Sequence, residues 1–147
     1  AFRAQLEIAA RTKMPVQIHT RDADEDTIEI MREFQGRVKG IIHCFTGTQW
    51  LADQALDLGY NISISGVVTF KNADSLRAIV KSLPLDRIHV ETDAPLLAPV
   101  PMRGKKNTPA FVVHTAEFVA DLKGGTGEEL AKVTRENALK MFPKIKW

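Results

Sequence analysis

Three side chains that suit a divalent metal ion stand at the ends of short apolar segments. His19 closes the segment PVQIH, His43 closes GIIH, and Asp93 closes RIHVETD. Two imidazole nitrogens and a carboxylate oxygen suit a catalytic divalent metal that keeps one coordination position open for water. Such a metal lowers the pKa of its bound water, so that hydroxide is available near neutral pH. The pattern predicts a catalytic metal site, with His19, His43 and Asp93 as ligands and Asp93 as a catalytic residue.

Each of these residues also has a structural explanation. A single histidine at a strand end is commonly a hydrogen-bonded structural residue, and Asp93, which precedes Ala94-Pro95, fits the cap of a turn. The joint occurrence of the three residues at equivalent strand ends favours the metal site. The spacing contains no short local motif, such as two histidines on one helix, so on the residues alone both explanations stay open.

Other candidates surround the predicted ligands. Glu91 shares a strand face with Asp93, so it is predicted either to accept a hydrogen bond from a ligating histidine or to be a polar residue inside a barrel. His89 shares that face too. At ~3.3 Å per residue it lies roughly 13 Å from Asp93, which predicts a structural role. Cys44 faces away from its neighbour His43, so a thiol nucleophile activated by that histidine is not expected.

A basic loop follows the last predicted strand. The segment MRGKKN carries Arg103, Lys105 and Lys106 beside Gly104. We expect these three side chains to bind substrate phosphates from a flexible loop, because the loop directly follows the strand that ends in Asp93. The alternative is an ordinary solvated loop.

Apolar and amphipathic segments alternate along most of the chain. Short segments rich in Ile and Val are predicted to be strands, at residues 15–20, 38–44, 60–65 and 87–92. Amphipathic helices precede and separate these strands, and two further helices follow the last one. Such alternation predicts parallel strands with helical crossovers, whose functional residues gather at the C-terminal strand ends. Two α/β architectures fit: a small open doubly wound sheet, or part of an eight-stranded (β/α) barrel of the TIM type.

Several helix ends are marked by particular residues. Asp22 and Asn72 are predicted to cap the helices that follow them. Thr126, with Glu129 three residues later, predicts a capping box at the start of the last helix. Gly124 is predicted to lie at the end of the preceding helix.

The composition is that of an ordinary globular domain. The 147 residues carry a net charge of +2, which neither requires nor excludes a nucleic-acid partner. Cys44 is the only cysteine, so no intrachain disulfide is possible, and a reducing, cytoplasmic location is expected. No apolar run approaches the ~20 residues that span a bilayer, so no membrane partner is expected. Because the sequence begins directly in a helical pattern, without Met or a capping residue, we expect it to be a fragment.

Five segments together resemble the TatD family of metal-dependent deoxyribonucleases. They are PVQIHTRDA, GIIHCFTG, SISG, ETDAP and RGKKNTPAFVVHTAEFVA, and the resemblance extends over essentially the whole chain. It implies a (β/α)-barrel hydrolase of the metallo-dependent hydrolase class that cuts phosphodiester bonds, generally as a 3′→5′ exonuclease on DNA. It also implies two divalent ions (Mg, Mn or Zn), with His19, His43 and Asp93 among their ligands.

The resemblance covers only about the last four strands of the family's barrel. Residues 1–147 are therefore expected to form the C-terminal half of a single TatD-like domain. The family's His-x-His segment and the Glu of its GEIGLD-like segment have no counterpart here. In the basic loop, Met102, Lys106 and Thr108 stand where the family often has an aromatic residue, Arg and Glu. A half-barrel leaves two strands without neighbours, so the N-terminal half or a second copy is expected to cover them.

Three functions are compatible with these features. The first is a nuclease of which this chain forms half the barrel, and which is nearly inactive as the isolated chain. The second is a module that binds phosphate or nucleic acid without catalysis. The third is a structural half-barrel whose exposed strand edges pair with another copy.

Overall fold

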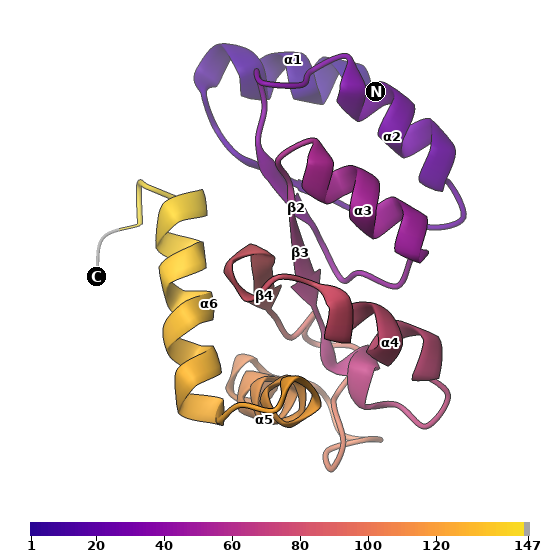
Figure 1. Ribbon diagram of the computed structural model, residues 1–147, viewed down its shortest axis with the longest axis vertical. Helices are drawn as coiled ribbons and strands as arrows, with labels where there is room; N and C mark the ends of the chain where they lie inside the picture. The colour runs from indigo at the N-terminus through magenta and orange to yellow at the C-terminus, as the bar shows by residue number, and fades with distance from the viewer. Residues whose placement is uncertain (146–147) are drawn as a thin grey trace.

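A four-stranded parallel sheet forms the centre of the protein in a computed structural model that describes residues 1–145 (Figure 1). The strands are β1 (Val16–Ile18), β2 (Gly40–Ile42), β3 (Asn61–Ile64) and β4 (Ile88–Val90). They lie in the order β1-β2-β3-β4, and each neighbouring pair is parallel. A doubly wound sheet reverses its strand order at a switch point, whereas a (β/α) barrel does not. The observed order therefore matches the barrel type and excludes the doubly wound alternative.

Helices connect the strands and follow the last one. The α-helices are α1 (Phe2–Thr12), α2 (Asp24–Arg32), α3 (Gln49–Asp57), α4 (Asp74–Ser82), α5 (Val112–Lys123) and α6 (Gly127–Met141). Short 3₁₀ helices are η1 (Gly66–Thr69), η2 (Leu85–Arg87) and η3 (Pro109–Phe111). Figure 1 shows α2, α3 and α4 following one another along one side of the sheet, with α5 and α6 beyond β4. Within residues 1–145, no helix is long and apolar enough to cross a bilayer.

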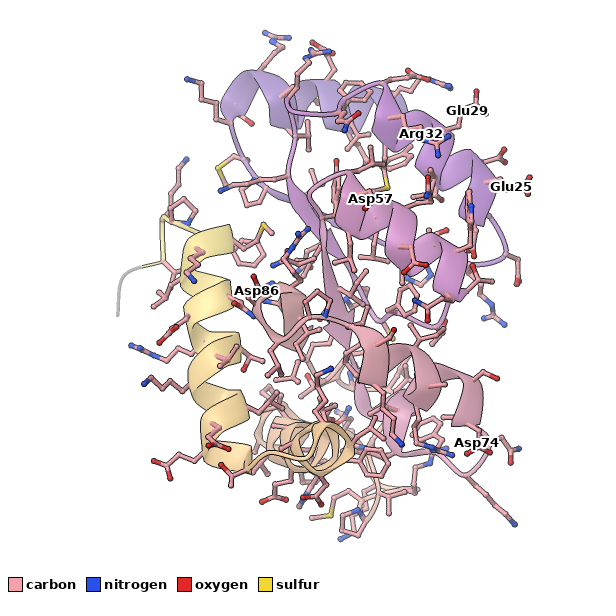
Figure 2. All side chains as sticks on the ribbon, in the orientation of Figure 1. Glu25, Glu29, Arg32, Asp57, Asp74 and Asp86 are labelled. Atoms are coloured by element: carbon pink, nitrogen blue, oxygen red, sulfur yellow. The ribbon has the colours of Figure 1, made fainter. Side chains whose placement is uncertain are left out.

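Helix α2 illustrates how the sequence pattern produces these elements. Ile28 and Met31, three residues apart, are fully buried against the sheet. Glu25, Glu29 and Arg32 lie on the outer face of the same helix (Figure 2). Acidic residues also fill its first turn, where they interact favourably with the positive end of the helix dipole.

The two faces of the sheet differ in polarity. The helix-covered face is apolar and belongs to the main hydrophobic core, through Ile18, Ile42, Ile62, Ile64 and Ile88. The opposite face carries polar side chains that bond across neighbouring strands: Asn61 to His89, and Ser63 to Glu91. Because successive residues of a strand point to opposite faces, one strand both anchors the core and presents polar groups.

The strands are shorter than predicted at their C-terminal ends. Cys44 has a φ of 45°, and Asp93 has a φ of 54°. Backbone in this left-handed region cannot continue a β-ladder. The chain therefore turns sharply just where the predicted ligands His43 and Asp93 stand.

Two of the predicted helix caps are wrong. Helix α2 begins after Ala23 and helix α4 after Ala73, and neither has a side-chain cap. Asp22 has a φ of 52° and lies in the turn before α2, so it cannot serve as the cap. The capping box of Thr126 and Glu129 is confirmed, as is the left-handed Gly124 at the end of α5.

Candidate metal centre at the strand ends

His43 is held at the end of β2 by contacts on both ring nitrogens. Its backbone N–H donates to the carbonyl oxygen of Ile18 at 2.8 Å, which places the residue beside β1. Its Nδ1 atom lies 2.9 Å from Oε2 of Glu91, and its Nε2 atom lies 3.1 Å from Oδ1 of Asp93. The imidazole ring is thereby fixed between two carboxylates from the end of β4.

Glu91 links this histidine to the neighbouring strand β3. Its Oε2 atom accepts from Oγ of Ser63 at 2.8 Å as well as bonding Nδ1 of His43. An ionised carboxylate only accepts, so a proton on Nδ1 would be donated to Glu91 and would leave the lone pair of a neutral His43 ring on Nε2, facing Asp93. The other oxygen, Oε1, is buried and has no hydrogen-bond partner within residues 1–145. Glu91 thus contacts His43 directly, while its predicted role behind a ligating histidine stays a prediction.

The pair formed by His43 and Asp93 fits a divalent metal. With its proton on Nδ1, His43 presents a lone pair to the lone pairs of Asp93 across 3.1 Å. Two such acceptors are stable at this distance only with a proton or a cation between them. Two ligand atoms of one tetrahedral metal ion lie roughly 3.3 Å apart, because each is about 2.0–2.2 Å from the metal. The donor atoms therefore stand at the spacing of a ligand pair.

His19 lies beside this pair, on the exposed rim. The centroids of the His19 and His43 rings are 6.1 Å apart, and the ring planes are tilted by 47°. Within residues 1–145, no three His, Cys, Asp or Glu side chains converge into a group that could hold a metal ion as they stand. The structure thus joins His43 to Asp93 directly and places His19 next to them, while the role of His19 as a third ligand stays a prediction.

The loop after β4, which ends in the basic segment 102–107, is anchored at several points, whereas a flexible loop was expected. The N–H of Val100 donates to Oγ1 of Thr69 at 2.9 Å. A Cβ atom at Gly66 would lie 2.5 Å from the carbonyl oxygen of Leu97, so only glycine permits this close approach. The guanidinium of Arg103 lies 3.9 Å from the centroid of the Phe70 ring. The loop therefore rests on the segment that follows β3.

The predicted phosphate-binding side chains differ in how firmly they are held. Arg103 stacks on Phe70 and donates to the carbonyl oxygen of Ala98 at 3.3 Å. Lys105 and Lys106 are exposed, and the ammonium of Lys105 lies 3.8 Å from the sulfur of Met102. Arg103 is thus pre-positioned, whereas Lys105 and Lys106 extend into solvent.

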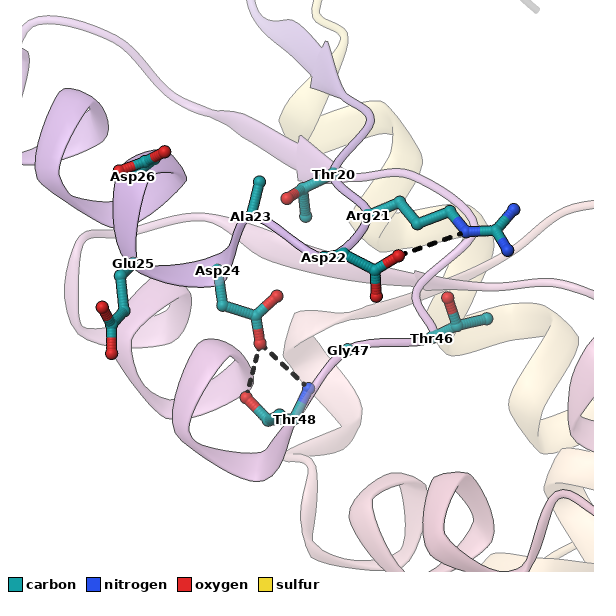
Figure 3. A pocket seen from close by; sticks show the side chains of 10 residues that line it. All are labelled: Thr20, Arg21, Asp22, Ala23, Asp24, Glu25, Asp26, Thr46, Gly47 and Thr48. Atoms are coloured by element: carbon teal, nitrogen blue, oxygen red, sulfur yellow. Dashed lines mark hydrogen bonds and ion pairs between the residues drawn. The ribbon is translucent and has the colours of Figure 1, made fainter.

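Sequence reasoning missed a cavity formed by the loops after β1 and β2. It has a volume of about 560 Å³ and is lined by residues 20–26 and 46–48 (Figure 3). Oδ2 of Asp24 accepts from Oγ1 of Thr48 at 2.6 Å, which braces the two loops against each other. In Figure 3 the side chain of Arg21 extends past Asp22, with their charged groups 3.7 Å apart. The cavity follows directly on the segments that carry His19 and His43.

His89 and Cys44 have the surroundings of structural residues. His89 is 6% exposed, bonds Asn61 at 2.9 Å, and has its pKa lowered to about 4 by burial. The sulfur of Cys44 lies 3.1 Å from Oγ of Ser65, and burial raises the pKa of its thiol. A neutral imidazole and a protonated thiol fit the structural roles predicted for them.

Comparison with known proteins agrees with the fold. Residues 1–143 match the family model described as TatD related DNase. The chain is 49% identical over 143 residues to the uncharacterized metal-dependent hydrolase YcfH of Escherichia coli K12, covering 97% of this chain and 54% of that protein. It is 44% identical over 142 residues to the uncharacterized metal-dependent hydrolase YabD of Bacillus subtilis, covering 96% and 56%.

A solved structure shows the same architecture. The TatD homologue YjjV of Escherichia coli superposes with a TM-score of 0.88 at 26% identity, over 96% of this chain and 54% of that one. The chain thus spans about half the length of the curated relatives it matches. A family match over 143 residues and relatives at 44–49% identity establish that this chain belongs to the TatD family.

Proposed function

We propose that this chain contributes His19, His43 and Asp93 to the metal centre of a hydrolase that cuts phosphodiester bonds in DNA. The observation that carries the proposal is the contact between Nε2 of His43 and Oδ1 of Asp93, with Glu91 behind the ring. The relatives YcfH and YabD are named metal-dependent hydrolases, which supports a divalent metal, with Mg, Mn or Zn as candidates. When bound, such an ion supplies a Lewis acid and an activated water.

The chain's own residues have distinct roles in this proposal. Glu91 keeps the ring proton of His43 on Nδ1, so the Nε2 lone pair points toward Asp93. Oδ1 of Asp93 would be a ligand to the metal, and its Oδ2 would accept a proton from the water that attacks the phosphodiester. These tasks need the proton of His43 held on Nδ1 and the Asp93 carboxylate held beside Nε2.

We propose that the basic loop holds the DNA strand by its phosphates. Arg103, pre-positioned on Phe70, makes an oriented contact with one phosphate. Lys105 and Lys106 add positive charge along the sugar–phosphate backbone of the DNA. Contacts of this kind carry no base information, so sequence preference is slight. A 3′→5′ exonuclease reaction, as the family resemblance implies, fits a loop that grips one strand end beside the metal.

A nuclease assay tests this function. The 147-residue chain and the product of its complete coding sequence are incubated with 5′-labelled single-stranded DNA and Mg²⁺, Mn²⁺ or Zn²⁺. We expect stepwise shortening from the 3′ end by the complete product, lost with EDTA and in His43→Ala, and almost no turnover by the 147-residue chain. The variant His114→Ala, which removes a histidine from α5, should keep the activity. Turnover that survives EDTA or His43→Ala would contradict the proposal.

A second function is favoured by one observation. Within residues 1–145 no three metal-binding side chains converge. The alternative we propose is therefore a module whose basic loop holds DNA phosphates and which lacks a complete catalytic site. This binding module would retain single-stranded DNA in the presence of EDTA and would show no metal-dependent cleavage with any of the three ions.

Strands β1 and β4 form the two outer edges of the sheet. No further strand pairs with either edge in the four-stranded sheet formed by residues 1–145. Because unpaired edges promote association, we propose that additional parallel strands cover them. Sedimentation of the 147-residue chain tests one source: a dimer supports a second copy, and a monomer contradicts it.

A further inference from the structure

A buried asparagine binds the backbone on both sides of Asp93. Asn107 is 2% exposed. Its Nδ2 atom donates to the carbonyl oxygen of Thr92 at 2.7 Å and to that of Leu96 at 2.6 Å. One amide group therefore joins the residue before Asp93 to the end of the turn after it.

Asp93 needs such support because its backbone is strained. Its φ of 54° lies in the left-handed region, which is unfavourable for a residue with a Cβ atom and persists only where surrounding contacts impose it. The turn is closed by the N–H of Leu96, which donates to the carbonyl oxygen of Asp93 at 3.0 Å. This φ sets the direction of the Cα–Cβ bond, and hence whether the Asp93 carboxylate reaches His43.

The remaining polar atoms of Asn107 bind the loop itself. Its backbone N–H donates to the carbonyl oxygen of Pro95 at 3.1 Å, and its Oδ1 accepts from the N–H of Thr108 at 2.9 Å. Asn107 also ends the segment that carries Arg103. The same residue therefore fixes the carboxylate that faces His43 and the base of the phosphate-binding loop.

We propose that Asn107 is the positioning residue of the metal centre. It holds Asp93 in the left-handed conformation that brings Oδ1 to Nε2 of His43, and it couples that geometry to the basic loop. The proposal rests on the proposed function, because it takes Asp93 to be a ligand. Asn107 acts through Asp93 and does not itself contact metal or substrate.

The chain offers a matched control at the other end of the same strand. Asn137 is also 2% exposed, and its Nδ2 also donates to two carbonyl oxygens, of Leu85 at 2.9 Å and of Ile88 at 2.8 Å. These carbonyls lie at the start of β4, away from Asp93. Removing either asparagine amide costs the same kind of buried hydrogen bonds, but only Asn107 acts on the turn that holds Asp93.

The experiment compares Asn107→Ala with Asn137→Ala in the 147-residue chain. NMR measures the Cα shift and the HN–Hα coupling of Asp93, which report its φ. Broadening of the His43 ring signals on titration with Mn²⁺ reports metal affinity. In Asn107→Ala we expect Asp93 to leave the left-handed region and the Mn²⁺ affinity to fall about tenfold or more. In Asn137→Ala we expect thermal stability to fall about as much as in Asn107→Ala. The φ of Asp93 and the Mn²⁺ affinity should stay as in the unsubstituted chain.

Two outcomes overturn the proposal. One is an Asn107→Ala variant whose Asp93 keeps its φ, and the other is an Asn137→Ala variant that shifts Asp93 equally. If Asn107→Ala does not fold, Asn107→Ser, which keeps one donor, should give an intermediate shift. If the unsubstituted chain does not bind Mn²⁺, metal binding by this chain is contradicted, while the φ of Asp93 still decides the role of Asn107.

Discussion

The side chain of His43 reaches across β3 to meet Asp93, with 3.1 Å between Nε2 and Oδ1. His43 follows β2 and Asp93 follows β4, so a whole strand separates their backbones. Neighbouring strands lie about 4.8 Å apart, so β2 and β4, which lie on either side of β3, are separated by roughly 10 Å. Contact is possible because β3 presents the small Ser63 at this point, which also donates to Glu91.

Replacing Ser63 with a larger residue should therefore break the site without touching a predicted ligand. Ser63→Val removes a hydroxyl donor to Glu91 and inserts methyl groups between β2 and β4. We expect the His43 ring to lose its fixed Nδ1–H tautomer and Mn²⁺ affinity to fall by about tenfold. Ring nitrogen shifts from NMR measure the first effect, and calorimetry measures the second. Ser82→Val, on the exposed side of α4, is the control, and an unchanged tautomer in Ser63→Val would refute the argument.

Burial of His89 should make stability depend on pH. Its pKa is lowered from 6.5 to about 4, so the unfolded chain takes up a proton at a higher pH than the folded chain. The contribution of His89 to the free energy of unfolding should therefore be level above pH 7 and fall between about pH 6.5 and pH 4, by about 3 kcal/mol. Urea unfolding at several pH values measures this slope. His89→Gln should flatten it and His114→Gln should not; equal slopes in both variants would exclude His89 as the cause.

The parts of the fold that follow from local patterns were predictable from the sequence. The alternation of apolar and amphipathic segments located all four strands, and Thr126 with Glu129 marked the start of α6. The strand-end position of His43 and Asp93 followed from the rule that parallel strands present their C-terminal ends at one rim. Their direct contact agrees with that rule.

Features that depend on tertiary contacts were not predictable in this way. Asp22 has the residue type of a helix cap, but its left-handed backbone places it in the turn before α2. The loop after β4, which ends in the basic segment 102–107, was expected to be flexible, yet Thr69 binds it at Val100 and Phe70 stacks on Arg103. Asn107 gives no signal in the sequence, since only the folded chain shows which two carbonyls it binds.

Lys123 should stabilise the fold by binding the end of α4. Its ammonium group donates to the carbonyl oxygens of Val80, Lys81 and Leu83 at 2.9, 3.1 and 2.7 Å. Lys123→Met keeps the apolar stem and leaves these acceptors unpaired, so the free energy of unfolding should fall by about 1–3 kcal/mol. Chemical unfolding at pH 7 measures the loss. Lys132→Met, on the exposed face of α6, should change stability little, and equal losses in both variants would contradict the capping role.

The last prediction tests whether Arg103 binds DNA because of its position or only because of its charge. Within residues 1–145, two arginines stack on phenylalanines: Arg103 on Phe70 at 3.9 Å, in the basic loop, and Arg37 on Phe34 at 5.2 Å, in the turn after α2. Arg103→Ala and Arg37→Ala remove the same charge. Only Arg103→Ala should weaken the binding of labelled single-stranded DNA, and its plot of log affinity against log salt should flatten by roughly 0.7, as expected for one lost phosphate contact.

Phe70→Leu tests the stacking itself in the same assay. It keeps the guanidinium charge and removes the aromatic face, so affinity should fall by about two- to fivefold while the salt slope stays unchanged. Fluorescence anisotropy at several salt concentrations gives both quantities for each variant. Equal weakening by Arg103→Ala and Arg37→Ala would mean that DNA responds to overall charge, and the basic loop would then lose its assigned role.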